Sequence, residues 1–268
     1  MKTRILSGIV LAVIMISSLT CGSWYLFGLN LMIALVGMFE LYRVIHMEKS
    51  GMAYVGYLAC ILYYICIAFG LEQYTMFVLV AVVMAVMAVY VFTFPKYQTD
   101  CVMMTLLGIF YVAVMLSYIY KVRILSDGIY IVWLIFVASW GNDTFAYFTG
   151  VFLGKHKMAP KLSPKKSVEG GIGGVAGATI LGAVYGYLVS PHMSELIAYP
   201  AFTFAAASFI GALLAIVGDL AASAIKRNHN VKDYGTLIPG HGGILDRFDS
   251  VIFTAPAVYW AVFIINSL

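Results

Sequence analysis

The sequence predicts an all-α membrane protein that crosses the bilayer about nine times. Of the 268 residues, 63% are hydrophobic and only 10% are charged, whereas soluble domains are about 45–50% apolar and about 25% charged. The mean hydropathy of +0.96 agrees. The apolar residues also gather in runs long enough for a membrane-spanning helix, which takes about 20 residues. A water-soluble globular fold is therefore excluded.

Each apolar run is expected to form one transmembrane helix. The first two runs are separated only by Cys-Gly-Ser, which predicts a tight helical hairpin. Lys2 and Arg4 imitate the start of a signal peptide, but no A-x-A cleavage site follows, so the first run is expected to remain as a span. The glycine-rich stretch 170–177 is expected to let two helices approach closely. The nine runs cover approximately residues 5–20, 22–42, 52–71, 74–94, 101–120, 128–149, 171–189, 201–225 and 250–268.

The distribution of Lys and Arg predicts the orientation. With the N-terminus in the cytoplasm, the cytoplasmic segments carry 14 of the 16 basic residues, and only Lys121 and Arg123 fall on the other side. Basic residues concentrate on the cytoplasmic side of membrane proteins. We therefore expect a cytoplasmic N-terminus and, with an odd number of spans, a C-terminus outside.

The polar residues divide the chain into two expected regions. Residues 1–125 form a plain apolar scaffold of five spans, and residues 126–268 form a catalytic region of four spans. Two long cytoplasmic loops, 151–170 and 226–249, hold 9 of the 16 basic residues. Chemistry is expected in this C-terminal region.

Acidic residues inside apolar runs mark candidate functional positions, because an ionisable group at membrane depth costs several kcal/mol. Asp143 and Asp219 lie within or at the edge of such runs, and Glu40 lies near the end of the second. Glu40 is three residues before Arg43, and a buried pair with that arginine is the simpler interpretation. Asp219 is different because of the residues that follow it.

Asp219, Ser223, Lys226 and Arg227 share one face of a helix. A Gly-rich segment, Pro239–Gly243, then precedes Asp246, Arg247 and Asp249 at the start of the last span. Glycine-rich backbone at a helix N-terminus presents N–H groups to phosphate. Carboxylate and phosphate oxygens are the ligands that Mg²⁺ prefers. The density of these groups within residues 219–249 predicts a phosphate and Mg²⁺ site.

At these residues the chain resembles the phosphatidate cytidylyltransferases, also called CDP-diacylglycerol synthases. Their signature reads here as Ser223-Ala-Ile-Lys226-Arg227, then Lys232-Asp233-Tyr-Gly235, then Pro239-Gly-His241-Gly242-Gly243-Ile-Leu-Asp246-Arg247-Phe-Asp249, without a departure at any fixed position. Such a set of residues at set spacings is far more specific than a lone glycine motif.

A second family-like region covers Asp143–Gly150, Gly154–His156 and Ser163–Gly170. It departs from the usual pattern at Phe145, where a Gly is usual, and at Ser167, where a Thr is usual. The Ser167 exchange keeps the hydroxyl. The resemblance thus covers roughly residues 140–250, and the first 130 residues only in hydropathy.

The resemblance implies an Mg²⁺-dependent reaction at the cytoplasmic face of the cell membrane, in which CTP and phosphatidate give CDP-diacylglycerol and pyrophosphate. It leaves open a second cation and a homodimer. The implied metal ligands are Asp219, Asp246 and Asp249. The implied catalytic residues are Asp219, Ser223, Lys226, Asp246, Arg247 and Asp249. The implied substrate-binding residues are Asp143, Lys165, Lys166, Arg227, Lys232, Asp233, His241, Gly242 and Gly243.

Three other functions remain to be weighed. A secondary transporter also carries intramembrane carboxylates, but the spans show no inverted repeat and the polar residues cluster at one face. A lipid kinase or a cytidylyltransferase for another lipid, such as a polyprenol, would be harder to distinguish. Nucleic-acid binding is disfavoured, because no binding motif is present and the basic residues are divided between membrane-edge loops.

Overall fold

The computed structural model describes residues 2–194, 197–240 and 242–267 and confirms the all-α membrane fold. Within these residues, eight helical segments are long and apolar enough to cross a membrane. The first predicted span, residues 5–20, corresponds to α1 (Lys2–Cys21), whose apolar part, Ser7–Cys21, is shorter. Every predicted run therefore falls on a helix, and the first is short for a span.

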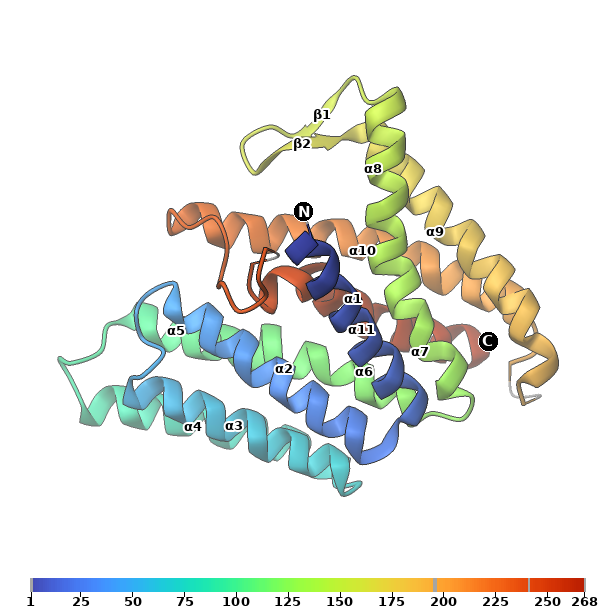
Figure 1. The fold of residues 1–268 in the computed structure, drawn as a ribbon. Helices are drawn as coiled ribbons and strands as arrows, with labels where there is room; N and C mark the ends of the chain where they lie inside the picture. Colours follow the sequence, from blue (N-terminus) through green and yellow to red (C-terminus); the bar gives the residue numbers. More distant parts are fainter. Residues whose placement is uncertain (1, 195–196, 241, 268) are drawn as a thin grey trace. The chain divides into compact units, whose positions relative to one another are not determined.

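The eight segments follow one another along the chain (Figure 1). The first four are α2 (Ser23–Arg43), α3 (Gly51–Ala68), Glu72–Phe92 with α4 (Thr75–Phe92), and Thr99–Arg123 with α5 (Thr99–Leu107) and α6 (Met115–Arg123). The last four are Gly128–Leu153 with α7 (Gly128–Phe136) and α8 (Asn142–Leu153), Val168–His192 with α9 (Val168–Val189), α10 (Pro200–Asn228), and α11 (Leu245–Ser267).

Two of these segments contain a π-helical stretch. Gly108–Val114 joins α5 to α6, and Val137–Gly141 joins α7 to α8. A π turn widens the helix locally and often occurs at functional sites. The second stretch ends directly before Asn142 and Asp143, so it sets the direction in which α8 presents these two side chains.

The chain forms two compact units. The first comprises Met1–Tyr120 and His229–Arg247, and the second comprises Lys121–Asn228 and Phe248–Leu268. The loop that carries much of the family-like signature thus clusters with the N-terminal helices. The expected division into a scaffold, residues 1–125, and a catalytic region, residues 126–268, concerns activity and stays a prediction.

In the first unit, a buried tyrosine determines how closely the helices pack. Tyr42 on α2 is fully buried, and its hydroxyl donates to the carbonyl of Thr105 at 3.1 Å. A Cβ placed on Gly56 or on Gly108 would lie 2.4 Å from that hydroxyl. Glycine at these two positions therefore makes room for the tyrosine against α3 and the first π-helical stretch.

In the second unit, glycines bring α8 and α9 together, as the stretch 170–177 predicts. A Cβ on Gly174 would lie 2.8 Å from the carbonyl oxygen of Asn142, and one on Gly177 would lie 2.3 Å from the Phe145 ring. On α10, a Cβ on Gly218 would lie 2.8 Å from the carbonyl oxygen of Asp249 on α11. Small residues at these crossings allow the backbones to approach closely.

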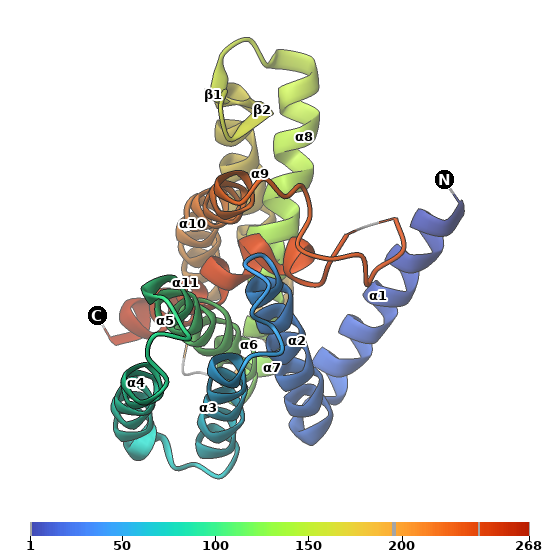
Figure 2. The same cartoon turned by 90° about the vertical axis from the view of Figure 1, so that its left-hand side faces the viewer.

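Between α8 and α9 the chain forms a β-hairpin, which the sequence did not indicate. Strands β1 (Lys157–Ala159) and β2 (Ser163–Ser167) pair antiparallel, with Lys157 opposite Ser167 and Ala159 opposite Ser163. Both views place the hairpin beside the C-terminal end of α8 (Figures 1 and 2). The five lysines of residues 155–166 therefore lie on the strands of this hairpin or next to them.

Cysteine labelling tests the orientation expected from the Lys and Arg distribution. In single-cysteine variants, Leu162→Cys and Thr236→Cys should react with a membrane-impermeant maleimide only after the cells are permeabilised, because both loops are expected inside. Ile124→Cys and Met193→Cys should react in intact cells. Labelling of all four in permeabilised cells is the control. Opposite accessibility of positions 162 and 236 would contradict one shared cytoplasmic site.

Candidate functional site

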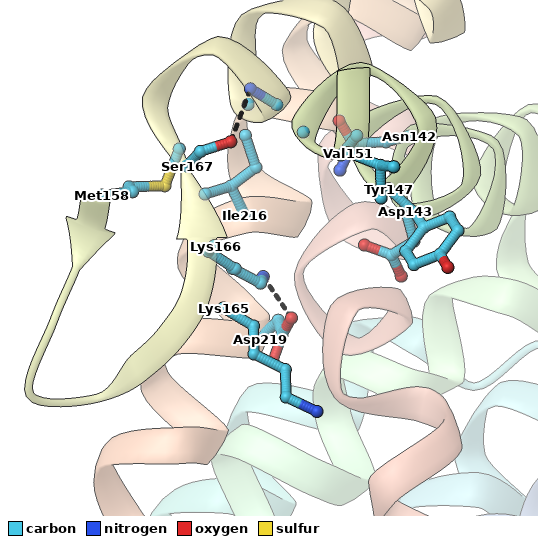
Figure 3. Close-up of a pocket in the computed structure, with 14 residues that line it drawn as sticks. Asn142, Asp143, Tyr147, Val151, Met158, Lys165, Lys166, Ser167, Ile216 and Asp219 are labelled. Carbon is cyan, nitrogen blue, oxygen red and sulfur yellow. Dashed lines mark hydrogen bonds and ion pairs between the residues drawn. The ribbon is translucent and has the colours of Figure 1, made fainter. Parts of the chain in front are cut away.

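The second unit contains a cavity of about 460 Å³ lined by α8, the hairpin, α9 and α10. Its charged residues are Asp143, Lys165, Lys166 and Asp219, and its apolar residues include Val151, Met158 and Ile216 (Figure 3). This volume is within the range of small-ligand pockets, which are mostly apolar with a few polar groups. The cavity can therefore hold a ligand that is ionic at one end and apolar at the other.

An ion pair crosses this cavity. Lys166 of β2 contacts the carboxylate of Asp219 on α10, and both side chains are about one-quarter exposed, at 26% and 24%. The hydroxyl of Ser223, one turn further along α10, donates to Asp219 Oδ1 at 3.4 Å. Asp219 and Ser223 thus face the same side, as their spacing predicts. Lys166 reaches them from a part of the chain 53 residues earlier.

Asp249 brings a further carboxylate to the same neighbourhood. It lies within electrostatic range of Asp219 and Asp143, and of the ammonium group of Lys226. The close approach of α10 and α11 at Gly218 explains this proximity, because Gly218 directly precedes Asp219 and contacts the Asp249 backbone. The second unit therefore gathers three predicted carboxylates and three predicted lysines.

The hairpin that carries Lys165 and Lys166 is fastened at its base by Glu169. The Glu169 carboxylate accepts the backbone N–H groups of Lys155 at 3.1 Å and of His156 at 3.2 Å, and it lies 2.5 Å from His156 Nδ1. Ser167 caps α9 by accepting the N–H of Gly170 at 3.1 Å. This hydroxyl role accounts for Ser at a position where Thr is usual, since either residue can cap a helix.

The first unit contains a second cavity, of about 500 Å³, within the loop 229–247. It is lined by Lys232, Asp233, Gly235, Thr236, Ile238, Gly240, Gly242 and Arg247. The loop turns back on itself at Ile238, whose N–H donates to the Gly242 carbonyl at 2.9 Å. Gly242 has a φ of +87°, which only glycine adopts readily.

Asp246 is buried beneath this loop, at 7% exposure. Its Oδ2 accepts the backbone N–H groups of Tyr234 at 2.9 Å and of Gly243 at 3.0 Å. Asp246 therefore organises the loop.

The predicted site residues divide between the two units. Asp143, Lys165, Lys166, Asp219, Ser223, Lys226, Arg227 and Asp249 belong to the second unit, and Lys232, Asp233, Gly242, Gly243, Asp246 and Arg247 belong to the first. His241 lies outside the described residues.

The prediction from sequence missed several residues at these sites. Asn142, Tyr147 and Met158 line the cavity of the second unit, and Glu169 fastens the hairpin. Tyr147 and Glu169 lie inside the second family-like region and Asn142 directly precedes it, and this was the available signal for them. Met158 had none, because its place depends on the hairpin.

Together, fold and site define a polytopic membrane protein with charged, ligand-sized cavities on its membrane helices and their connecting loop. The chain belongs to the cytidylyltransferase family, whose sequence pattern matches residues 2–265. This membership confirms the enzyme class expected from the signature, that of a nucleotidyltransferase.

Three relatives illustrate the similarity. The phosphatidate cytidylyltransferase of Bacillus subtilis (strain 168) is 30% identical over 97% of both chains. The phosphatidate cytidylyltransferase of Thermotoga maritima is 42% identical over 127 residues, which cover 47% of this chain and 46% of the relative. The enzyme of the same name from Staphylococcus aureus (strain COL) is 38% identical over 151 residues, which cover 56% and 55%.

The close crossing of α8 and α9, which both line the cavity of the second unit, can be tested with two alanine variants. In Gly174→Ala, the new Cβ would lie 2.5 Å from Asn142 Oδ1 and 2.8 Å from the Asn142 carbonyl oxygen. Such overpacking typically destabilises a fold by about 1–3 kcal/mol, so the melting temperature in detergent should fall. Gly28→Ala is the matched control, because no atom lies within 4 Å of its Cβ. Equal melting temperatures would contradict the close crossing.

Proposed function

We propose that this chain transfers a cytidylyl group from CTP to phosphatidate, which gives CDP-diacylglycerol and pyrophosphate in phospholipid biosynthesis. The proposal rests on one observation above all: a relative named phosphatidate cytidylyltransferase aligns over nearly the whole chain. The unbroken signature from Ser223 to Asp249 supports the same reaction.

The chemistry requires neutralisation of charge more than a strong base. A phosphate oxygen of phosphatidate is already anionic at pH 7 and attacks the α-phosphorus of CTP. A new P–O bond forms as the bond to the β-phosphate oxygen breaks, and pyrophosphate leaves. The main obstacle is the repulsion between two anions, so catalysis consists largely of positioning and electrostatic stabilisation. Lys166, Lys226 and Arg247 are the cations that we assign to the substrate phosphates.

The two cavities suit different substrates. The cavity of the second unit combines Lys165 and Lys166 with the apolar Val151 and Ile216, which suits a phosphate attached to a lipid. The loop cavity of the first unit combines Lys232 and Arg247 with glycine backbone, which suits the phosphates of a nucleotide. We therefore assign phosphatidate to the former and CTP to the latter.

The carboxylates fit an Mg²⁺ ion that arrives with the nucleotide. Among the described residues, no three His, Cys, Asp or Glu side chains lie close enough to hold a metal by themselves. Mg²⁺, however, is usually held by one or two carboxylates together with substrate phosphates and water. Asp219 and Asp249 of the second unit would supply such a pair, Asp246 is a candidate ligand from the signature alone, and a bound Mg²⁺ would neutralise phosphate charge.

We also propose that the active site faces the cytoplasm at the cell membrane. The supporting observation is the concentration of Lys and Arg in the loops 151–170 and 226–249. A site at the edge of the membrane can receive a lipid from the bilayer and a nucleotide from the cytoplasm.

The direct test is product formation by the purified chain in detergent. Labelled CTP with phosphatidate and Mg²⁺ should give a labelled CDP-lipid, and omission of Mg²⁺ should abolish it. Polyprenyl phosphate in place of phosphatidate is the control for another lipid specificity. A labelled product only from that control, or from neither lipid, would refute the proposal.

Asparagine variants test the metal ligands, because they keep the shape of the side chain and remove its charge. Asp219→Asn should leave a folded, extractable protein and lower turnover by at least about a hundredfold. Asp246→Asn can still accept the N–H groups of Tyr234 and Gly243 through its amide oxygen, so the loop should persist while turnover is lost. Wild-type turnover in Asp246→Asn would remove Asp246 from the metal ligands.

A salt series distinguishes phosphate contacts from a diffuse surface charge. Lys226→Ala and Lys166→Ala should lower activity severely at every ionic strength, because charge-assisted contacts to bound phosphates resist screening. Lys157 and Lys161 are exposed and are expected only to attract anionic lipid headgroups. Lys157→Ala should therefore have a mild effect that fades as salt rises. Indistinguishable, salt-sensitive losses in all variants would contradict specific contacts.

A further inference from the structure

Glu40, near the end of α2, holds a segment of the chain that lies more than 200 residues further on. The side chain is buried, at 4% exposure. Its Oε1 accepts the backbone N–H of Ile244 at 3.0 Å, and its Oε2 accepts the N–H of Leu245 at 2.8 Å. The ion pair with Arg43 expected from the sequence is thus replaced by two backbone contacts, although Arg43 is close enough to attract the carboxylate.

The two donors belong to the start of α11, where backbone N–H groups have no partner within the helix. A carboxylate is well suited to this place, because the helix dipole leaves partial positive charge at the N-terminus. Glu40 therefore does for α11 what a capping side chain does, but from a separate helix. The contact joins α2 to the end of the loop 229–247.

Two glycines of the loop close over the same carboxylate. A Cβ on Gly235 would lie 2.4 Å from Glu40 Oε1, and a Cβ on Gly243 would lie 2.4 Å from Glu40 Oε2. Any larger residue at either position would displace the carboxylate or the loop. The loop thus closes around both carboxylate oxygens of Glu40.

Asp246 is the second buried carboxylate that holds this loop. Asp246 accepts the N–H groups of Tyr234 and Gly243, so the two carboxylates together accept four backbone N–H groups of one short loop. Buried acceptors that are fully satisfied in this way specify a single conformation, whereas loss of one acceptor leaves a donor unpaired at a cost of about 1–3 kcal/mol.

We propose that Glu40 is a positioning residue for the nucleotide cavity. It lies outside the family-like signature and outside the lining of the cavity, and it acts by holding the loop in the conformation that presents Lys232, Asp233 and Arg247. The expected effect on the KM for CTP rests on the proposed function, because it assumes that this loop binds CTP. The expected effect on the conformation of the loop does not rest on it.

Glu40→Gln is the informative variant, since it preserves volume. The amide has one acceptor oxygen, and its NH₂ group would face a backbone N–H. Hydrogen exchange of the amides in residues 234–245 should accelerate about tenfold or more, while exchange in α3 and α9 stays unchanged. The KM for CTP should rise about tenfold, and the KM for phosphatidate should change less than about twofold. Glu72→Gln, at an exposed position, is the matched control and should change none of these.

A second variant keeps the test decisive if Glu40→Gln is poorly folded. Gly235→Ala keeps the glutamate at position 40 but forces a Cβ against its carboxylate, so the same local exchange and the same selective rise in KM should follow. Unchanged exchange in 234–245, uniformly faster exchange throughout the chain, or faster local exchange with an unaltered KM for CTP would each overturn the positioning role. A wild-type chain that makes no CDP-lipid would refute the proposed function alone, and the exchange measurement would still decide whether Glu40 holds the loop.

Discussion

The constraint on which the rest of this structure depends is the cost of placing charged groups among apolar helices. Buried charge has little water to solvate it there, so a buried carboxylate needs a partner within the protein. Asp219 takes Lys166, whereas Glu40 and Asp246 take backbone N–H groups. These partnerships draw the hairpin onto α10 and the signature loop onto α2. The same charges that are expensive to bury therefore shape both cavities.

Glycine has the complementary role of allowing the approach that these partnerships require. Gly218 lets α10 reach the backbone of α11 beside Asp249, and Gly174 lets α9 reach α8 beside Asp143. In the loop, Gly235 and Gly243 leave space for the Glu40 carboxylate. In each case a Cβ would occupy space that belongs to a neighbouring backbone or a charged group. Much of the glycine in the family-like regions thus serves packing around the site.

The cavity of the second unit takes its charged side chains from two helices and from a hairpin. Asp143 and Asp219 project from helices, whereas Lys165 and Lys166 project from a hairpin held at its base by Glu169. The charged groups of this cavity therefore depend both on the helix packing and on the hairpin.

The membrane class, the nine helical runs and the glycine-mediated packing of α9 followed from the sequence alone, because hydropathy and residue size act locally along the chain. The signature likewise identified the enzyme family, since its residues lie close together in sequence. The π-helical stretch before Asp143, the β-hairpin, the pairing of Lys166 with Asp219 and the attachment of Glu40 to Ile244 and Leu245 appeared only in the tertiary structure. The last two depend on which distant segment supplies a partner for a buried charge, and no local pattern in the sequence encodes that choice.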